Sequence, residues 1–184
     1  MQNTEIEDIY NKKVQFLLFD TKRKGFSEKD IRQGDYYVFW YDAKMKNYLL
    51  FLSYLHKKKF IQARVQAMLV VDKPEYMLNI EKIKNESKDE KLKADVSVYL
   101  KRDITDQERL MHSFSQEKES QDKQDDEDPT ELDLKKNFFY VINPEGRIID
   151  CAKIYSFMHE ENIFKRITSK ISKDIDDRIN SGKS

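Results

Sequence analysis

Few side chains in this sequence could bind a soft metal or attack a substrate. Cys151 is the only cysteine, and Met158 and His159 follow it closely, so these three form the one group of neighbouring soft donors. Thiolate, thioether and imidazole groups are the ligands that Cu(I) prefers, which makes a Cu(I) site at these residues one hypothesis. The alternative is that Cys151 is a small buried apolar residue and His159 a polar residue at a helix start.

The other two histidines, His56 and His112, offer little chemistry. His56 precedes three lysines at an expected helix end, where positive charge interacts favourably with the helix dipole. His112, between a methionine and a serine, is interpreted as a surface histidine. Neither has a recognisable partner acid, so a nucleophilic triad has no support. We therefore expect no catalytic residue, no cofactor and no resident metal.

Length and composition exclude several classes of protein. The 184 residues fit one domain. With 34 basic and 34 acidic residues the net charge is zero, which removes the bulk-charge argument for nucleic-acid binding. The 4 glycines are too dispersed for a phosphate-binding loop, and a single cysteine rules out an internal disulfide or a Cys-rich zinc site. The longest apolar runs fall far below the ~20 residues of a membrane span.

The hydrophobic pattern predicts an α/β domain with a mixed sheet. Runs of consecutive apolar residues are typical of strands covered on both faces, and the expected strands are 14–20, 36–41, 67–71, 96–100 and 138–142. Asn143-Pro144-Glu145-Gly146 has the residues of a type I turn, so the last strand should continue into a hairpin with 147–151.

Three helices are expected from apolar spacing and capping residues. The first covers Lys44–Lys58. The second begins after Asp72 and the third after Thr105, with apolar sides formed respectively by Met77, Leu78 and Ile80 and by Leu110, Met111 and Phe114.

The segment 116–131 differs in composition from the rest of the chain. It contains eight acidic residues against two lysines and no large apolar residue. Such a segment cannot bury enough surface to offset its ordering entropy, so we predict a disordered surface loop. A docking arm for a partner is the alternative.

Five isoleucines spaced by four mark a C-terminal helix, from Ile163 to Ile179. Each step of four turns the row by about 40°, so that Ile163 and Ile179 point about 160° apart. We expect the first half of the row to pack on the sheet, and Ile175 and Ile179 to contact a partner. The alternative is that these two residues lie in a frayed helix end exposed to solvent.

The order of these elements resembles the Sco/SenC family of thioredoxin-fold copper chaperones that assist cytochrome c oxidase assembly. The resemblance rests on Phe19-Asp20, on the stretch from Ser27 to Gly34, and on the final Phe138–Arg147 hairpin. It implies a thioredoxin-like mixed β-sheet flanked by helices, with an N-terminal strand extension and an acidic insertion. The domain would span 14–172, preceded by an extension at 1–13 and followed by a helix end and tail at 173–184.

The resemblance also implies where a copper site would lie. The family pairs a Cys-x-x-x-Cys motif after the aromatic strand with a histidine before the final hairpin. Aligned on Gly34 and Phe138, these positions fall at about Lys46, Leu50 and Lys135. Neither lysine nor leucine supplies a soft donor, so we expect that the metal chemistry has been lost.

A fold kept without its ligands predicts a binding role. We expect a non-catalytic accessory subunit of a mitochondrial respiratory complex, cytochrome c oxidase, peripheral to the inner membrane on the intermembrane-space side. Its partners would be other protein subunits. The first ten residues are acidic and contain no arginine, unlike a transit peptide, so either the targeting signal is internal or a presequence has been removed. Without the family's usual membrane anchor, we expect attachment through protein contacts. Besides Ile175 and Ile179, the candidate contacts are Tyr48, Phe51 and Tyr54, which lie off the apolar stripe of the first helix. The alternatives are a copper chaperone with relocated ligands and a soluble thioredoxin-like adaptor.

Overall fold

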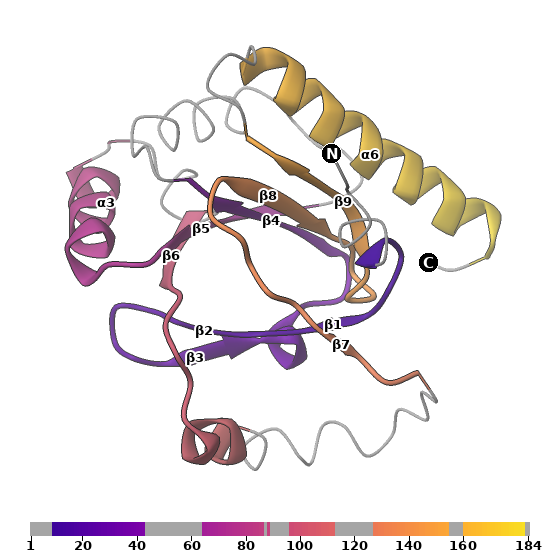
Figure 1. The fold of residues 1–184 in the computed structure, drawn as a ribbon. Coiled ribbons are helices and arrows are strands. Elements are labelled where there is room, and N and C mark those ends of the chain that lie inside the picture. The colour runs from indigo at the N-terminus through magenta and orange to yellow at the C-terminus, as the bar shows by residue number, and fades with distance from the viewer. Residues whose placement is uncertain are drawn as a thin grey trace.

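The computed structural model describes residues 9–42, 64–86, 88, 96–112, 127–154 and 160–182. Its main element is a seven-stranded mixed sheet in the order β3-β2-β6-β5-β4-β8-β9 (Figure 1). The strands of this sheet are β2 (Leu17–Phe19), β3 (Gly25–Ser27), β4 (Asp35–Tyr41), β5 (Arg64–Val71), β6 (Val96–Leu100), β8 (Phe138–Ile142) and β9 (Ile148–Lys153). A short parallel pair is formed by β1 (Val14–Gln15) and β7 (Thr130–Glu131), and the helical elements include η1 (Glu28–Asp30), α3 (Pro74–Glu86) and α6 (Glu160–Asn180).

The connectivity of the sheet is thioredoxin-like. Strands β4, β5 and β6 run parallel, whereas β8 is antiparallel to β4 and forms a hairpin with β9. The four-strand core β5-β4-β8-β9 is followed by the C-terminal helix α6. The predicted fold class, a mixed sheet flanked by helices, is confirmed.

One face of the sheet is covered by α3 and α6. Met77 and Ile80 of α3 pack there, together with Ile163, Phe164, Ile167 and Ile171 of α6. Strand β4 contributes Tyr36, Val38 and Trp40 to this core, because alternate side chains of a strand point to the same face.

The opposite face is covered by chain segments from both ends of the domain. Tyr37, Phe39 and Tyr41 of β4 point to this side, where Val14, Phe16, Leu132 and Leu134 pack on them. The Phe16 and Phe39 rings meet edge to face, with centroids 4.9 Å apart. Both faces of β4 are therefore buried, which explains why its sequence is apolar without alternation.

The strand predictions are confirmed, with one refinement at the N-terminus. The segment expected as one strand at 14–20 forms two, because Val14–Gln15 pairs with β7 whereas Leu17–Phe19 pairs with β3 and β6. The turn is also confirmed, since the Gly146 N–H donates to the Asn143 carbonyl over 2.9 Å. Gly146 has φ +81°, a conformation that glycine adopts without strain.

The helix predictions need corrections. Helix α3 begins at Pro74, two residues after Asp72. Leu78 is 65% exposed and does not belong to the apolar side of α3. Residues 106–112 are helical, and the Glu108 N–H donates to the Thr105 hydroxyl as predicted, but Leu110 and Met111 are exposed. The helix expected at Lys44–Lys58 lies outside the described residues, and so does Phe114.

The row of isoleucines leaves the core one position later than expected. Ile163, Ile167 and Ile171 are buried, and Ile179 is 58% exposed. Ile175, expected to be free for a partner, packs in part against the core. The reason is that about 40° of rotation per step carries the row off the sheet gradually.

The acidic segment is described only at its end. Residues 116–126 lie outside the described residues. Thr130 and Glu131, predicted as loop, form β7 and pair with Val14 and Gln15 of β1. The hydrogen bonds of a parallel strand pair are sufficient to order these two residues despite their composition.

Candidate functional site

Parallel strands β4, β5 and β6 end at the same edge of the sheet, where ligands bind in many α/β proteins. The residues that follow these strands are Asp42, Asp72 and Lys101. Lys135 and Lys136, which precede β8, reach the same edge because β8 is antiparallel to β4. This edge is therefore polar, with lysines facing aspartates.

Ion pairs occupy this edge. Lys136 Nζ donates to an Asp72 carboxylate oxygen over 3.0 Å, and Lys101 Nζ lies 3.4 Å from Asp133. Burial alone would raise the pKa of Asp72, but the hydrogen bond and charge of Lys136 outweigh it and hold that pKa below its usual value. Burial and the neighbouring Asp72 charge raise the pKa of Tyr41 to about 12. Lysines paired with carboxylates, and a protonated phenol, provide no nucleophile at neutral pH.

Of the positions that the Sco resemblance assigns to copper, one lies in the described residues. Lys135 is exposed, and its backbone N–H donates to the Tyr140 hydroxyl over 2.7 Å. Its ammonium group does not fit a soft metal. Lys46 and Leu50 lie outside the described residues, as do Tyr48, Phe51, Tyr54, Met158 and His159.

Cys151 lies on β9 and is 3% exposed. It packs with Tyr140 in the hydrophobic core on the sheet face opposite α3 and α6. Burial, and next the negative charge of Asp150, raise the pKa of the Cys151 thiol to about 12. The thiolate is the form that attacks disulfides and binds metals, so this thiol is inert at neutral pH. The interpretation of Cys151 as a buried apolar residue is confirmed.

His112 is not the surface histidine that the sequence suggested. Its imidazole is only 17% exposed; Nε2 lies 2.7 Å from Ser27 Oγ and 3.6 Å from an Asp30 oxygen. The ring also lies against Gly25, where an added Cβ would be 3.2 Å from Nδ1. Serine and aspartate approach the same ring nitrogen, and Ser27 is buried, so this is not the arrangement of a catalytic triad. The His112 side chain connects the helix at 106–112 to β3 and η1 through these contacts.

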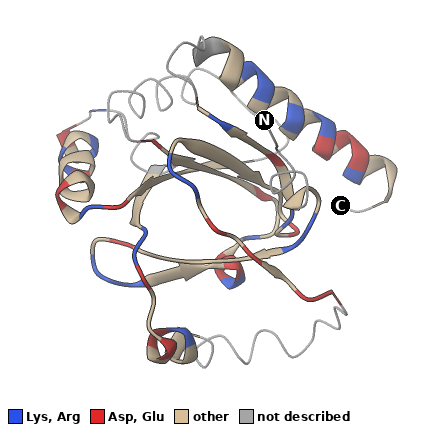
Figure 2. Cartoon of the chain, in the orientation of Figure 1, with Lys and Arg blue, Asp and Glu red and all other residues tan. Residues whose placement is uncertain are grey.

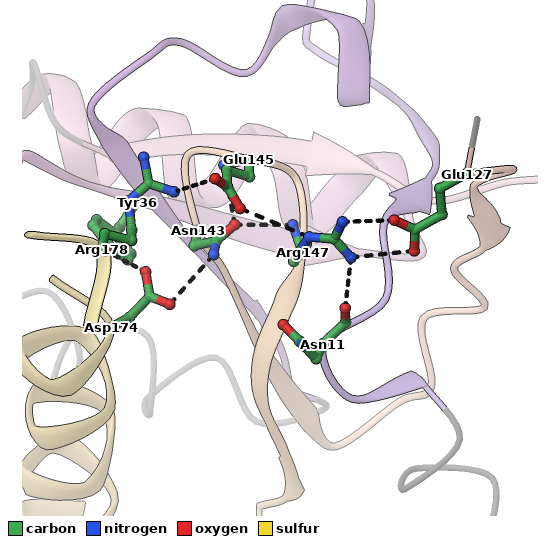
Figure 3. A network of polar contacts seen from close by, with 8 residues as sticks. All are labelled: Asn11, Tyr36, Glu127, Asn143, Glu145, Arg147, Asp174 and Arg178. Atoms are coloured by element: carbon green, nitrogen blue, oxygen red, sulfur yellow. Dashed lines mark hydrogen bonds and ion pairs between the residues drawn. The ribbon is translucent and has the colours of Figure 1, made fainter. Parts of the chain in front are cut away.

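A second polar region surrounds the β8–β9 turn (Figure 3). The Asn143 side-chain oxygen accepts from the backbone N–H groups of Glu145 and Arg147, each over 3.0 Å. Arg147 donates from both terminal nitrogens to Glu127, over 3.1 and 2.6 Å, and also to the Asn11 carbonyl. The hydrogen bonds from Arg147 lower the pKa of Glu127. Arg147 thus joins the turn, the N-terminal segment and the end of the acidic segment.

Helix α6 closes this region from the other side. The Tyr36 hydroxyl donates to an Asp174 oxygen over 2.5 Å, and the Asn143 amide donates to the other oxygen over 3.3 Å. Arg178 lies 3.3 Å from Glu145. A shallow pocket of about 360 Å³ lies among these groups. It is lined by Asn11, Asn143, Glu145, Arg147, Asp174, Asp177, Arg178 and Ser181.

Comparison with solved structures finds chains that are similar in fold. Among them are Sco proteins, the family that the sequence resembles. The chain aligns with copper-bound yeast Sco1 at 15% identity and a TM-score of 0.48, covering 88% of this chain and 93% of that one. A SCO1/SenC family lipoprotein from Bacillus anthracis gives 16% identity and a TM-score of 0.49, with 88% and 96% covered. Copper-bound Arabidopsis thaliana ScoI aligns at 12% identity and a TM-score of 0.49, covering 88% of this chain and 98% of that one. No protein-family model and no curated protein matches the chain.

Two properties of the described residues bear on the predicted site. Within these ranges, no three histidine, cysteine, aspartate or glutamate side chains gather in a way that could hold a metal ion. Among the helices described, none is long and apolar enough to cross a membrane.

Sequence reasoning identified the turn at Asn143 but not the pocket beside it. Asp174 is one of many charged residues in the sequence, and its partners Tyr36 and Asn143 lie far from it along the chain. A signal was present, because acidic residues in the last turns of a helix oppose its dipole and call for an explanation.

Proposed function

We propose that this chain is a non-catalytic protein-binding subunit of a mitochondrial respiratory complex, cytochrome c oxidase. The observation that supports it is the edge of the sheet after β4, β5 and β6, where lysines and aspartates neutralise one another. Lys101 pairs with Asp133, and Lys136 with Asp72. The choice of complex comes from the sequence resemblance to Sco proteins. On that basis the chain lies peripheral to the inner membrane, on the intermembrane-space side.

Exposed apolar side chains supply candidate contacts. Leu110 and Met111 are adjacent on the helix at 106–112 and are 56% and 64% exposed. Ile179 remains a candidate, whereas Ile175 is engaged in part by the core. Tyr48, Phe51 and Tyr54 remain candidates from the sequence. Exposed large apolar side chains are candidates for protein contacts, although single ones are common on any protein surface.

The proposal is tested by native-gel fractionation of gently solubilised mitochondria, with the chain followed beside oxidase activity. We expect comigration that survives a salt wash. Migration as a free species of 22.1 kDa would contradict it. A variant with Leu110→Lys and Met111→Lys tests these contacts against Gln107→Lys, a matched change at an exposed position of the same helix.

The two alternatives predict different results. A copper chaperone with relocated ligands would hold about one Cu(I) per chain after anaerobic loading, and Cys151→Ala would abolish it. An adaptor that docks through its acidic segment would lose its partner when residues 116–126 are deleted. Neither change should affect comigration if the chain is a resident subunit that binds through its folded domain.

A further inference from the structure

The pocket beside the β8–β9 turn carries more negative than positive charge. Arg147 is engaged by Glu127, and Arg178 is engaged by Glu145. The residues that line the pocket include these two guanidinium groups and three carboxylates, those of Glu145, Asp174 and Asp177, which leaves a net charge of minus one. Among the described residues, the donors to the Asp174 carboxylate are the neutral side chains of Tyr36 and Asn143.

Asp177 is the least compensated of these groups. It is exposed and lines the pocket. Its backbone carbonyl accepts from the Ser181 N–H, but within the described part of the chain its carboxylate has no hydrogen-bond or ion-pair partner. The carboxylate is therefore available to a ligand in the pocket.

The position of the pocket adds to this negative charge. It lies at the C-terminal end of α6, a helix of 21 residues, where the aligned peptide groups place the negative pole of the helix dipole. Figure 2 shows basic residues along the earlier turns of α6 and acidic residues near its end. Lys165, Arg166, Lys170 and Lys173 precede Asp174, Asp176 and Asp177. The three aspartates lie near the end of the helix, where the dipole disfavours negative charge, whereas Arg178 in the last turn follows the dipole preference.

We propose that this pocket binds the ammonium or guanidinium group of a lysine or arginine side chain on a partner protein. The choice of a protein as the source rests on the proposed function. A volume of about 360 Å³ is suited to a long side chain rather than to a bare ion. The carboxylates also do not converge as metal ligands among the described residues. A cationic side chain would place its charge near Asp177 and the end of α6.

Binding is tested with the full chain labelled with ¹⁵N and titrated with N-acetyl-lysine N-methylamide. The matched probe is the same compound acetylated at Nε, which is neutral. We expect saturable shifts of the Gly146, Ser181 and Gly182 amides with the cationic probe, weakened by added salt, and none with the neutral probe. Equal shifts with both probes, shifts that map elsewhere, or no shifts would overturn the proposal.

A pair of variants isolates the carboxylate. Asp177→Asn removes the charge that lines the pocket, whereas Asp176→Asn removes the same charge one residue away, at an exposed position that does not line it. We expect Asp177→Asn to weaken binding of the cationic probe about fivefold, the value for one partly exposed ion pair, and Asp176→Asn less than twofold. Equal effects would show that only general charge matters and would overturn the proposal.

Probe binding and comigration, both measured on the wild-type chain, separate this inference from the proposed function. If the wild-type chain binds the probe but does not comigrate with the oxidase, the pocket stands and the choice of complex is wrong. If the wild-type chain comigrates with the oxidase and does not bind the probe, the proposed function stands and the assignment of the pocket is wrong. Spermidine, titrated in parallel, distinguishes the source: binding at least tenfold tighter than the lysine probe would favour a free polyamine and overturn the assignment to a protein side chain.

Discussion

Tyr36 on β4 and Asp174 on α6 are 138 residues apart in the sequence, yet the tyrosine hydroxyl donates to the carboxylate over 2.5 Å. Burial, followed by the hydrogen bond to Asp174 and its charge, raises the pKa of Tyr36. The phenol therefore stays protonated and remains a donor throughout the neutral range. This contact joins the first strand of the thioredoxin-like core to its last helix.

Removing the Tyr36 hydroxyl should loosen the end of α6. We expect Tyr36→Phe to lower the free energy of unfolding by about 1–2 kcal/mol, because Asp174 loses a donor in a partly buried position. Urea denaturation gives the value. Tyr76→Phe serves as the control, since Tyr76 is exposed on α3, and it should change stability by less than about 0.5 kcal/mol. Equal stabilities of the two variants would contradict the assigned role.

Asp150 is a fully buried carboxylate on β9 that depends on its partners. It accepts from Arg166 at 2.8 and 2.7 Å and from the Tyr10 hydroxyl at 2.6 Å. Removing one partner of a buried pair costs about 3–5 kcal/mol, and partial exposure of Arg166 reduces this to about 2–3 kcal/mol for Arg166→Ala. Thermal or urea unfolding measures the loss.

The control for this change is Arg109→Ala. Arg109 pairs with Glu131 at the surface, where both side chains are about half exposed, so its loss should cost less than about 1 kcal/mol. If the two arginine variants are equally stable, the Asp150 pair contributes no more than a surface contact.

How far the sequence predicts the structure depends on whether the signal is local. Strands such as Phe138–Ile142 follow from their own residues, because burial on both faces leaves no polar position. The gradual exit of the isoleucine row follows from helix geometry alone. The contacts of Tyr36, Asp150 and His112 do not, because their partners are brought close only by the topology of the sheet. A histidine next to a methionine gives no indication that Ser27, 85 residues earlier, lies beside it.

His112 should hold the helix at 106–112 against β3. His112→Ala removes the contact with Ser27 Oγ and the packing on Gly25, so we expect a loss of about 1 kcal/mol. Hydrogen exchange should accelerate at the amides of Arg109 and Leu110 and stay unchanged in β8. Gln107→Ala, at an exposed position of the same helix, is the control. Unchanged exchange in His112→Ala would mean that other contacts hold the helix.

The buried Cys151 thiol should make the fold sensitive to alkali. Its pKa is raised from 9.0 to about 12 in the folded chain, so below pH 9 the thiol is protonated in both states and its contribution to stability is complete. As pH rises from about 9 to about 12, the unfolded chain loses this proton while the folded chain keeps it. Stability is therefore lost across this window, by at most about 1.4 kcal/mol per pH unit for one group.

Cys151→Ala isolates this effect. Urea unfolding between pH 8 and pH 10.5 should show a shallower fall in stability for the variant than for the wild type, whatever their difference at pH 8. The slope that remains comes from the buried tyrosines, whose pKa values burial also raises: Tyr10, Tyr36, Tyr41, Tyr99 and Tyr140. A thiol-reactive dye at pH 8 should label the wild type only after unfolding, because the folded chain presents neither access nor thiolate. Parallel slopes would show that folding does not raise the Cys151 pKa, and rapid labelling of the folded chain would show that the thiol is accessible. Either result would reopen the role of Cys151 as a metal ligand.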